Sequence, residues 1–224
     1  MRSLENRGLA WLTDAIMKTI GIVLFEGFEL LDVFGPAEAY GIRDLDGAFR
    51  LLMVAQQVGP IASAQGPSAM AEYGFADCPH LDIILLPGGI GTRREVENQT
   101  LGAWLKTRSE AAERVTSVCT GAALLARVGL LDGRRATSNK RSLDWVMSQG
   151  PKVQWIGEAR WVEDGKFATS SGVSAGIDMA LAIIAQVCGA EMAEKAAVGM
   201  EYEWHRDANW DPFAKIWGRT VKTV

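Results

Sequence analysis

The sequence predicts an α/β domain in which helices cover both faces of a doubly wound, mostly parallel sheet. Short apolar runs bounded by turn residues alternate with helix-like segments, which is the order that β-α-β units require. Several of the runs are apolar on both faces, as in parallel strands covered on each side. The 224 residues are 48% hydrophobic and 22% charged, a composition typical of one globular domain.

The first half of the chain carries the clearest alternation. Its runs of strand-like sequence lie, in order, at 19–25, 49–55, 81–89 and 114–118, with a further short strand expected at 61–66. A helix is expected at 28–41, after the first strand, and another at 99–113, before the fourth. A third follows the fourth strand and is expected to close at Gly133.

The second half is more mixed. Residues 134–139 and 153–171 favour strands, the latter as a hairpin that turns at Glu163, Asp164 and Gly165. An apolar helix is expected over 174–189, and another helix over 191–204.

The boundaries predicted for the chain are an N-terminal extension at 1–17, one domain at 18–205 and a C-terminal tail at 206–224. No repeat or Pro/Gly/Ser-rich linker divides the domain. Trp210, Phe213 and Trp217 of the tail are expected to dock on the body or on a second subunit.

The charged residues and the possible metal ligands argue against several classes of function. A net charge of −4 without a run of Lys or Arg argues against a nucleic-acid partner, so a small molecule is expected. The two histidines have no metal-ligand spacing around them, and no metal is expected. The sequence has neither a signal-peptide pattern nor an apolar run of membrane-spanning length. Three widely spaced cysteines suit a reduced cytoplasmic protein, which is the expected location.

Cys119 lies where the strand at 114–118 gives way to a helix. A thiol at a helix N-terminus is near unpaired N–H groups, which favour the thiolate and lower the pKa. The stretch "SVCTG" therefore predicts a cysteine nucleophile elbow. The alternative is that Cys119 is a small buried hydrophobic residue.

Two other glycine-containing motifs compete for the function. "LLPGGIG" ends a strand but lacks the three spaced glycines of a dinucleotide site, so Gly88 and Gly89 are interpreted as exposing N–H groups to a developing anion. "GVSAG" matches a serine nucleophile elbow, for which His205 is the one downstream histidine. We favour Ser174 as a helix N-cap instead.

Three acidic residues follow the first strand. Glu26, Glu29 and Asp32 are all able to reach the sheet edge where Cys119 emerges. Charges at a helix start are commonly solvated, which is the expectation for the two glutamates. Asp32 lies between Leu31 and Val33 in an apolar stretch, so it is the candidate for a protonated partner of the thiolate.

Four stretches in order resemble the ThiJ/PfpI superfamily, whose fold is flavodoxin-like, of the class I glutamine amidotransferase type. They are "LFEGFELLDVFGP", "LDIILLPGGIG", "VTSVCTGAALLARVGLLDGRRATS" and "SSGVSAGIDMAL". The resemblance covers about residues 18–200. It is greatest to the isocyanide hydratase branch, which has the same "D…GP" and "VTSVCTG" segments.

The resemblance implies a site and a reaction. Cys119 is implied as the nucleophile, Asp32 as its acid–base partner, and the backbone N–H groups of Gly89 and Thr120 as the anion site. Many relatives carry a histidine where this chain has Asn139. Asparagine does not exchange protons near neutral pH, which argues against protease or glyoxalase chemistry. Gly88 and Asn139 are expected only to line the pocket.

The implied activity is a lyase reaction in which an isocyanide is hydrated to an N-substituted formamide without a cofactor. Members of the resembled family are commonly dimers, so a homodimer is expected. One alternative is a thiol redox sensor without metabolic turnover, since peroxide also attacks a thiolate. The other is the effector half of a transcription regulator, which the acidic charge and short tail disfavour. The physiological substrate is left open.

Overall fold

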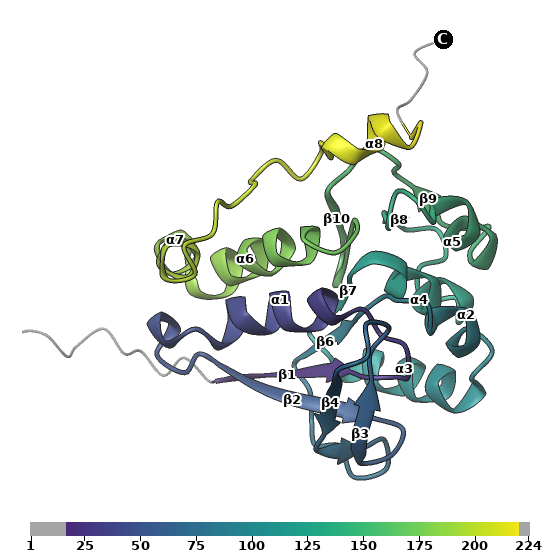
Figure 1. The fold of residues 1–224 in the computed structure, drawn as a ribbon, viewed down its shortest axis with the longest axis horizontal. Helices are drawn as coiled ribbons and strands as arrows, with labels where there is room; N and C mark the ends of the chain where they lie inside the picture. Colours follow the sequence, from purple (N-terminus) through teal and green to yellow (C-terminus); the bar gives the residue numbers. More distant parts are fainter. Residues whose placement is uncertain (1–16, 220–224) are drawn as a thin grey trace, which may run out of the picture.

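The computed structural model describes residues 17–219, which form a central sheet with helices on both faces (Figure 1). The strands of this sheet are, in spatial order, β10 (Trp161–Asp164), β11 (Phe167–Ser170), β7 (Arg114–Ser117), β6 (Ile83–Leu86), β1 (Lys18–Val23), β2 (Phe49–Ala55) and β5 (Tyr73–Gly74). All neighbours pair in parallel except β10 and β11. The predicted fold class is therefore confirmed.

The helices form two layers. Right-handed crossovers place helices on opposite faces when the chain steps in opposite directions along a sheet. The step from β1 to β2 carries α1 (Leu30–Gly41), which lies beside α6 (Ala175–Cys188) and α7 (Ala190–Gly199) on one face (Figure 1). The opposite step, from β6 to β7, carries α3 (Gln99–Ala111) on the other face.

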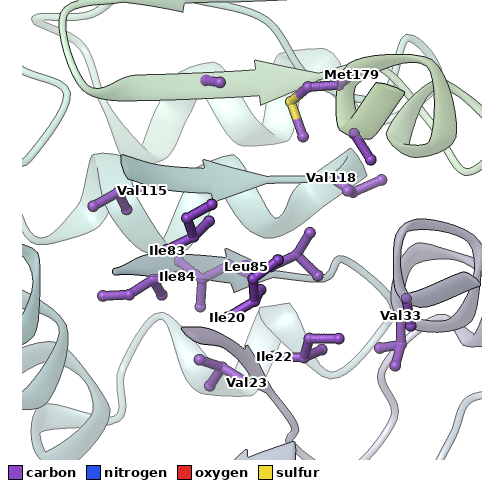
Figure 2. Packing of buried hydrophobic residues seen from close by; sticks show 14 of the residues in the cluster. Ile20, Ile22, Val23, Val33, Ile83, Ile84, Leu85, Val115, Val118 and Met179 are labelled. Atoms are coloured by element: carbon purple, nitrogen blue, oxygen red, sulfur yellow. The ribbon is translucent and has the colours of Figure 1, made fainter. Parts of the chain in front are cut away.

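The core lies between these layers and is centred on the parallel strands. Every residue of β6 is buried, as are the last four of β1. Because both faces of these strands are covered, their sequences are continuous apolar runs rather than alternating ones. Figure 2 shows side chains of β1 and β6 packed with others from β7, α1 and α6: Ile20, Ile22, Val23, Ile83, Ile84, Leu85, Val115, Val33 and Met179.

Smaller elements surround the sheet. The strands β3 (Gly59–Ala62) and β4 (Ser68–Ala71) form an antiparallel pair, and β8 (Arg135–Ala136) and β9 (Gln154–Trp155) form a parallel one. The 3-10 helices are η1 (Arg43–Leu45) and η2 (Cys119–Gly121). The short α-helices are α2 (Thr92–Glu95), α4 (Ala122–Arg127), α5 (Leu143–Gln149) and α8 (Pro212–Ile216). The helix expected to close at Gly133 ends at Arg127 instead. Gly129, with a φ of 82°, follows two residues later.

The C-terminal tail is anchored on the body of the protein. The Arg160 N–H donates to the Ala208 carbonyl and the Asp211 N–H to that of Glu158, at 2.8 Å each. Asp211 itself is buried. The tail aromatic residues remain about half exposed, with 55% for Trp210 and 45% for Trp217. The proposed extension at 1–17 falls almost entirely outside the described residues.

The parallel arrangement brings loops that are far apart in sequence to one edge of the sheet. The segments after β1, β6, β7 and β11 all begin at the carboxyl ends of neighbouring strands, which is where ligands bind in open α/β sheets. None of the helices in residues 17–219 has the length and apolar character needed to cross a bilayer.

Candidate active site

Cys119 occupies a sharp turn between β7 and α4. Its φ of 57° is in the left-handed region, which costs a non-glycine residue energy and is frequent at functional sites. The surrounding strands hold this conformation: the Cys119 N–H donates to the Ser171 carbonyl at 3.1 Å, and its carbonyl accepts from the Ser138 hydroxyl at 2.6 Å. The predicted cysteine elbow is therefore present in the backbone.

Two glycines allow the loop after β6 to approach the elbow. A Cβ on Gly88 would lie 2.6 Å from the Thr120 nitrogen and 2.8 Å from the Cys119 Cβ. Gly89 has a φ of 116°, and a Cβ there would collide with the Gly27 carbonyl. Only glycine fits both positions. The "PGG" sequence thus provides the close approach of two backbones beside the cysteine.

Asp32 is fully buried in the first turn of α1 and lies at the same edge of the sheet as Cys119. Its Oδ2 accepts a hydrogen bond from the Gly88 N–H at 2.8 Å, whereas Oδ1 has no partner among the residues described. Burial raises the pKa of Asp32 to about 7, although the Gly88 N–H opposes the rise. The carboxyl is therefore able to exchange a proton near neutral pH.

The thiol of Cys119 interacts with this carboxyl. Burial and the charge of Asp32 raise the pKa of Cys119 above its ordinary value, while hydrogen bonding from Thr120 lowers it. The expectation of a depressed pKa is therefore wrong. The exposed fraction of Cys119 is only 7%, and the helix that follows is short, so desolvation outweighs the helix dipole. We conclude that the two groups share one proton and one negative charge above pH 7.

The N–H groups of Gly89 and Thr120, which were expected to bind an anion, have different partners in the structure. The Gly89 N–H donates to the Thr120 hydroxyl at 3.1 Å, so an incoming anion has to displace that hydroxyl. The Thr120 N–H faces the Cys119 sulfur and stabilises its anion. The Thr92 hydroxyl donates to the Gly89 carbonyl at 2.7 Å and contacts the Thr120 hydroxyl at 3.1 Å.

The other acidic candidates are engaged elsewhere. Glu26 is exposed and accepts from the Ala62 N–H at 3.2 Å. Glu29 accepts from the Gln65 side chain and affects Asp32 and Cys119 only through its charge. Asp32 is thus the one of the three carboxyls that is fully buried, as the sequence pattern predicts.

Asn139 lies in the wall of a neighbouring cavity of about 250 Å³. Its Oδ1 accepts from the Ser142 N–H at 3.0 Å, which fixes the turn into α5. Its Nδ2 approaches Gly172 so closely that a side chain there would collide with it. Tail residues Phe213 and Trp217 complete the wall. Both ends of the Asn139 side-chain amide are therefore in contact with neighbouring backbone.

The geometry does not support the competing motifs. Both N–H groups of the glycine pair are occupied within the protein, so they do not form an open phosphate cradle. Ser174 occupies the N-cap position of α6, as predicted, but its hydroxyl accepts from Arg160 at 3.2 Å and makes no capping hydrogen bond. The His205 ring contacts the Trp210 carbonyl rather than a serine. Within residues 17–219 no group of three His, Cys, Asp or Glu side chains is placed to hold a metal.

No sequence pattern predicted a role for Arg93, which borders the site on α2. Its guanidinium lies 4.0 Å from the centre of the Trp145 ring and donates to Ser142 at 3.1 Å. These partners belong to α5 and the turn before it, which was expected to be neither a helix nor part of the site. Only the tertiary structure brings the two segments together.

A buried cysteine elbow beside a carboxyl, at the edge of a mostly parallel sheet, places the chain among flavodoxin-like α/β proteins with a cysteine at the strand–helix turn. The chain belongs to the DJ-1/PfpI family, which residues 18–186 match.

Individual relatives agree with this membership. The chain is 32% identical over 183 residues to the isonitrile hydratase of Pseudomonas putida, covering 82% of this chain and 78% of that protein. A crystal structure of a ThiJ/PfpI family protein from Pseudomonas syringae has a TM-score of 0.76 at 30% identity, covering 83% of this chain and 75% of that one.

A transcription regulator is also similar to this chain. The HTH-type transcriptional regulator GbdR of Pseudomonas aeruginosa is 26% identical over 195 residues, which cover 86% of this chain but 52% of the regulator. The present chain thus matches about half of the length of that protein.

Proposed function

We propose that the protein is a lyase that hydrates isocyanides, or similarly small electrophiles, to N-substituted formamides. The observation that carries the proposal is the buried Asp32 carboxyl, with a pKa of about 7, beside Cys119 at the elbow. A nucleophile next to a group that exchanges protons near neutrality is what addition to a carbon–nitrogen triple bond requires. The similarity to an isonitrile hydratase supports the choice of substrate.

The proposed reaction has two steps. The Cys119 sulfur bonds to the terminal isocyanide carbon, and the electron pair that remains on that carbon takes the proton held by Asp32. The product of this step is a thioimidate. Water then adds to the same carbon, one of its protons goes to the nitrogen and the other returns to Asp32, and the carbon–sulfur bond breaks to return the thiolate. The sum is isocyanide plus water to formamide, so water is the only co-reactant.

The backbone donors have a role in both steps. The Thr120 N–H stabilises the sulfur anion before attack and after release. The Gly89 N–H becomes available to the developing negative charge when the Thr120 hydroxyl rotates away. Gly88 holds Asp32 in place through its N–H. Asn139 is proposed as a polar wall without a proton to give.

Formamide production from an aryl isocyanide tests the proposal directly. The wild type is expected to release formamide that is identified by mass spectrometry, with one oxygen atom from labelled water. If no isocyanide is hydrated, yet peroxide converts Cys119 rapidly to a sulfinate, the redox-sensor alternative replaces the hydratase.

We also propose that the protein is a cytoplasmic homodimer. The cysteines in the described part of the chain are all free, as in a reducing compartment. Leu31 and Phe34 of α1 are 41% and 45% exposed although they flank the buried Asp32. A second copy of the chain is the proposed cover for this apolar surface. Light scattering at micromolar concentration should give about twice the mass of one chain, and a monomer mass would contradict the dimer.

A further inference from the structure

Arg93 carries a positive charge that no carboxylate compensates within residues 17–219. Its Nη1 donates to the Thr92 hydroxyl at 3.2 Å and approaches the Gly89 carbonyl at 3.5 Å, and its Nη2 donates to the Ser142 hydroxyl. All of these acceptors are neutral oxygens. Of the five N–H groups that a guanidinium has, the one on Nε makes no hydrogen bond in the described structure.

The neighbouring arginine shows the usual arrangement. Arg94 is exposed, forms an ion pair with Glu95 at 2.7 Å and donates to the Glu26 carbonyl at 2.9 Å. Arg93 is half-buried instead and is stacked on Trp145. Stacking on an indole ring holds a guanidinium in one orientation. Arg93 is therefore a fixed, uncompensated charge.

This charge lies close to the nucleophile. The Thr92 hydroxyl that accepts from Arg93 is 3.1 Å from the Thr120 hydroxyl, and Thr120 follows Cys119 directly in the chain. Burial lowers the pKa of Arg93, and the negative charge of a Cys119 thiolate opposes that shift. The carboxyls that act on Cys119 are Asp32 and, more weakly, Glu29, which is hydrogen-bonded to Gln65 in the segment after β3.

We propose that Arg93 is a specificity-determining residue that selects substrates with a carboxylate, or another anionic group, a few atoms from the electrophilic carbon. The inference rests on the proposed hydratase function and names its substrate class. The unused N–H of Arg93 would receive the anionic group, while the terminal carbon faces the Cys119 sulfur. A carboxylate fits a stacked guanidinium better than a neutral ester does.

Two pairs of matched probes test the proposal. Isocyanoacetate and its methyl ester differ only in the charge of the substrate. Iodoacetate and iodoacetamide alkylate a cysteine by the same displacement, so their rates at Cys119, followed by mass spectrometry of the peptide, do not depend on hydratase activity. The variants are Arg93→Gln, Arg93→Lys, which keeps the charge, and Arg94→Gln as the matched control.

In Arg93→Gln, the ratio of the iodoacetate rate to the iodoacetamide rate should fall by about tenfold, as expected from one unit charge a few ångströms away in a half-exposed site. The KM for isocyanoacetate should rise by a similar factor, and that for the ester should not. Arg93→Lys should retain part of both preferences, and Arg94→Gln should retain them fully. Added salt should weaken the preference of the wild type.

Several outcomes would overturn the inference. If Arg93→Gln slows both alkylating reagents equally, Arg93 serves the thiolate and not the substrate. The inference also fails if Arg93→Gln weakens the turnover of isocyanoacetate and of its ester equally, or if Cys119 reacts with neither alkylating reagent. If the alkylation ratio changes as expected but no isocyanide is hydrated, the selectivity stands and the proposed reaction fails.

Discussion

Two buried aspartates of this protein have opposite surroundings. Asp178 of α6 accepts from Arg160 through Nε at 2.8 Å, from the Tyr202 hydroxyl at 3.1 Å and from the His205 N–H at 3.0 Å. Asp32 of α1 accepts one backbone hydrogen bond, from the Gly88 N–H, and otherwise hydrogen-bonds only with the Cys119 thiol, while its Oδ1 has no hydrogen-bond partner in the described structure. Both side chains are fully buried.

The difference distinguishes a structural carboxylate from a reactive one. A buried carboxylate is tolerated when several hydrogen-bond donors surround it, and these hydrogen bonds connect the secondary-structure elements that carry the donors. Asp178 links α6 to β10 and to the segment before the tail in this way. A carboxyl without enough donors keeps its proton to a higher pH, which is the state required of an acid catalyst. Asp32 has this second environment.

The largest effect is expected at the proposed nucleophile. Cys119→Ala removes the sulfur that is proposed to bond to substrate, and formamide production should fall by about four orders of magnitude or more. The thermal unfolding midpoint should change little, because alanine fits the space of a small thiol. A rate near that of the wild type would assign the nucleophile elsewhere, and Cys78→Ala is the control.

Asp32→Asn should lower turnover by about 10²–10⁴-fold, the range of a lost general acid or base. In the wild type, kcat/KM should rise with pH through about 7, because loss of one proton from the Asp32–Cys119 pair creates the nucleophile. This rise near pH 7 should be absent in Asp32→Asn. If it persists there, another group controls the reaction.

Asp178→Asn should act on stability instead. The substitution removes the 2.7 Å ion pair of buried Arg160 and leaves it only the longer pair with Asp211 at 3.9 Å. Breaking a buried ion pair costs about 3–5 kcal/mol of unfolding free energy. Chemical denaturation measures this loss. Turnover per folded molecule, determined at low temperature, should stay near the wild-type value. A large loss of turnover in folded protein would contradict the distinction between the two aspartates.

Asp32 should also make the stability of the protein depend on pH. The pKa of Asp32 is about 7 in the fold and near 4 when unfolded, so the unfolded state releases the proton first as the pH rises. Asp32 therefore destabilises the protein increasingly between about pH 4 and 7, by up to about 4 kcal/mol. Asp32→Asn should be more stable than the wild type at pH 8 but not at pH 4. Equal differences at both values would argue against the raised pKa.

The smallest effect is expected at Asn139. Asn139→Ala removes the contact with Ser142 but no proton donor, so turnover should fall only about threefold, within the net value of one hydrogen bond. Initial rates with the same isocyanide measure it. A loss as large as that of Asp32→Asn would make Asn139 part of the chemistry.

Much of the fold was predictable because its signals are local. The expected strands at 49–55 and 114–118 correspond to β2 and β7, and the hairpin turning at 163–165 corresponds to β10 and β11. Parallel strands buried on both faces have continuous apolar sequences, which stand out against the helices between them. The short elements β4, α2 and α5 were not predicted, because segments of four to seven residues carry too little periodicity.

The sequence by itself determined the fold class, the cysteine at the elbow and the aspartate in an apolar stretch, since each depends on neighbouring residues in the chain. Only the tertiary structure decided the protonation of the site. Desolvation raises the pKa of both Asp32 and Cys119, and the charge of Asp32 adds to the rise at Cys119 across 87 positions of sequence separation. Burial depends on how distant segments pack around a group, and no local pattern records it. The position of Arg93 against Trp145 was decided in the same way.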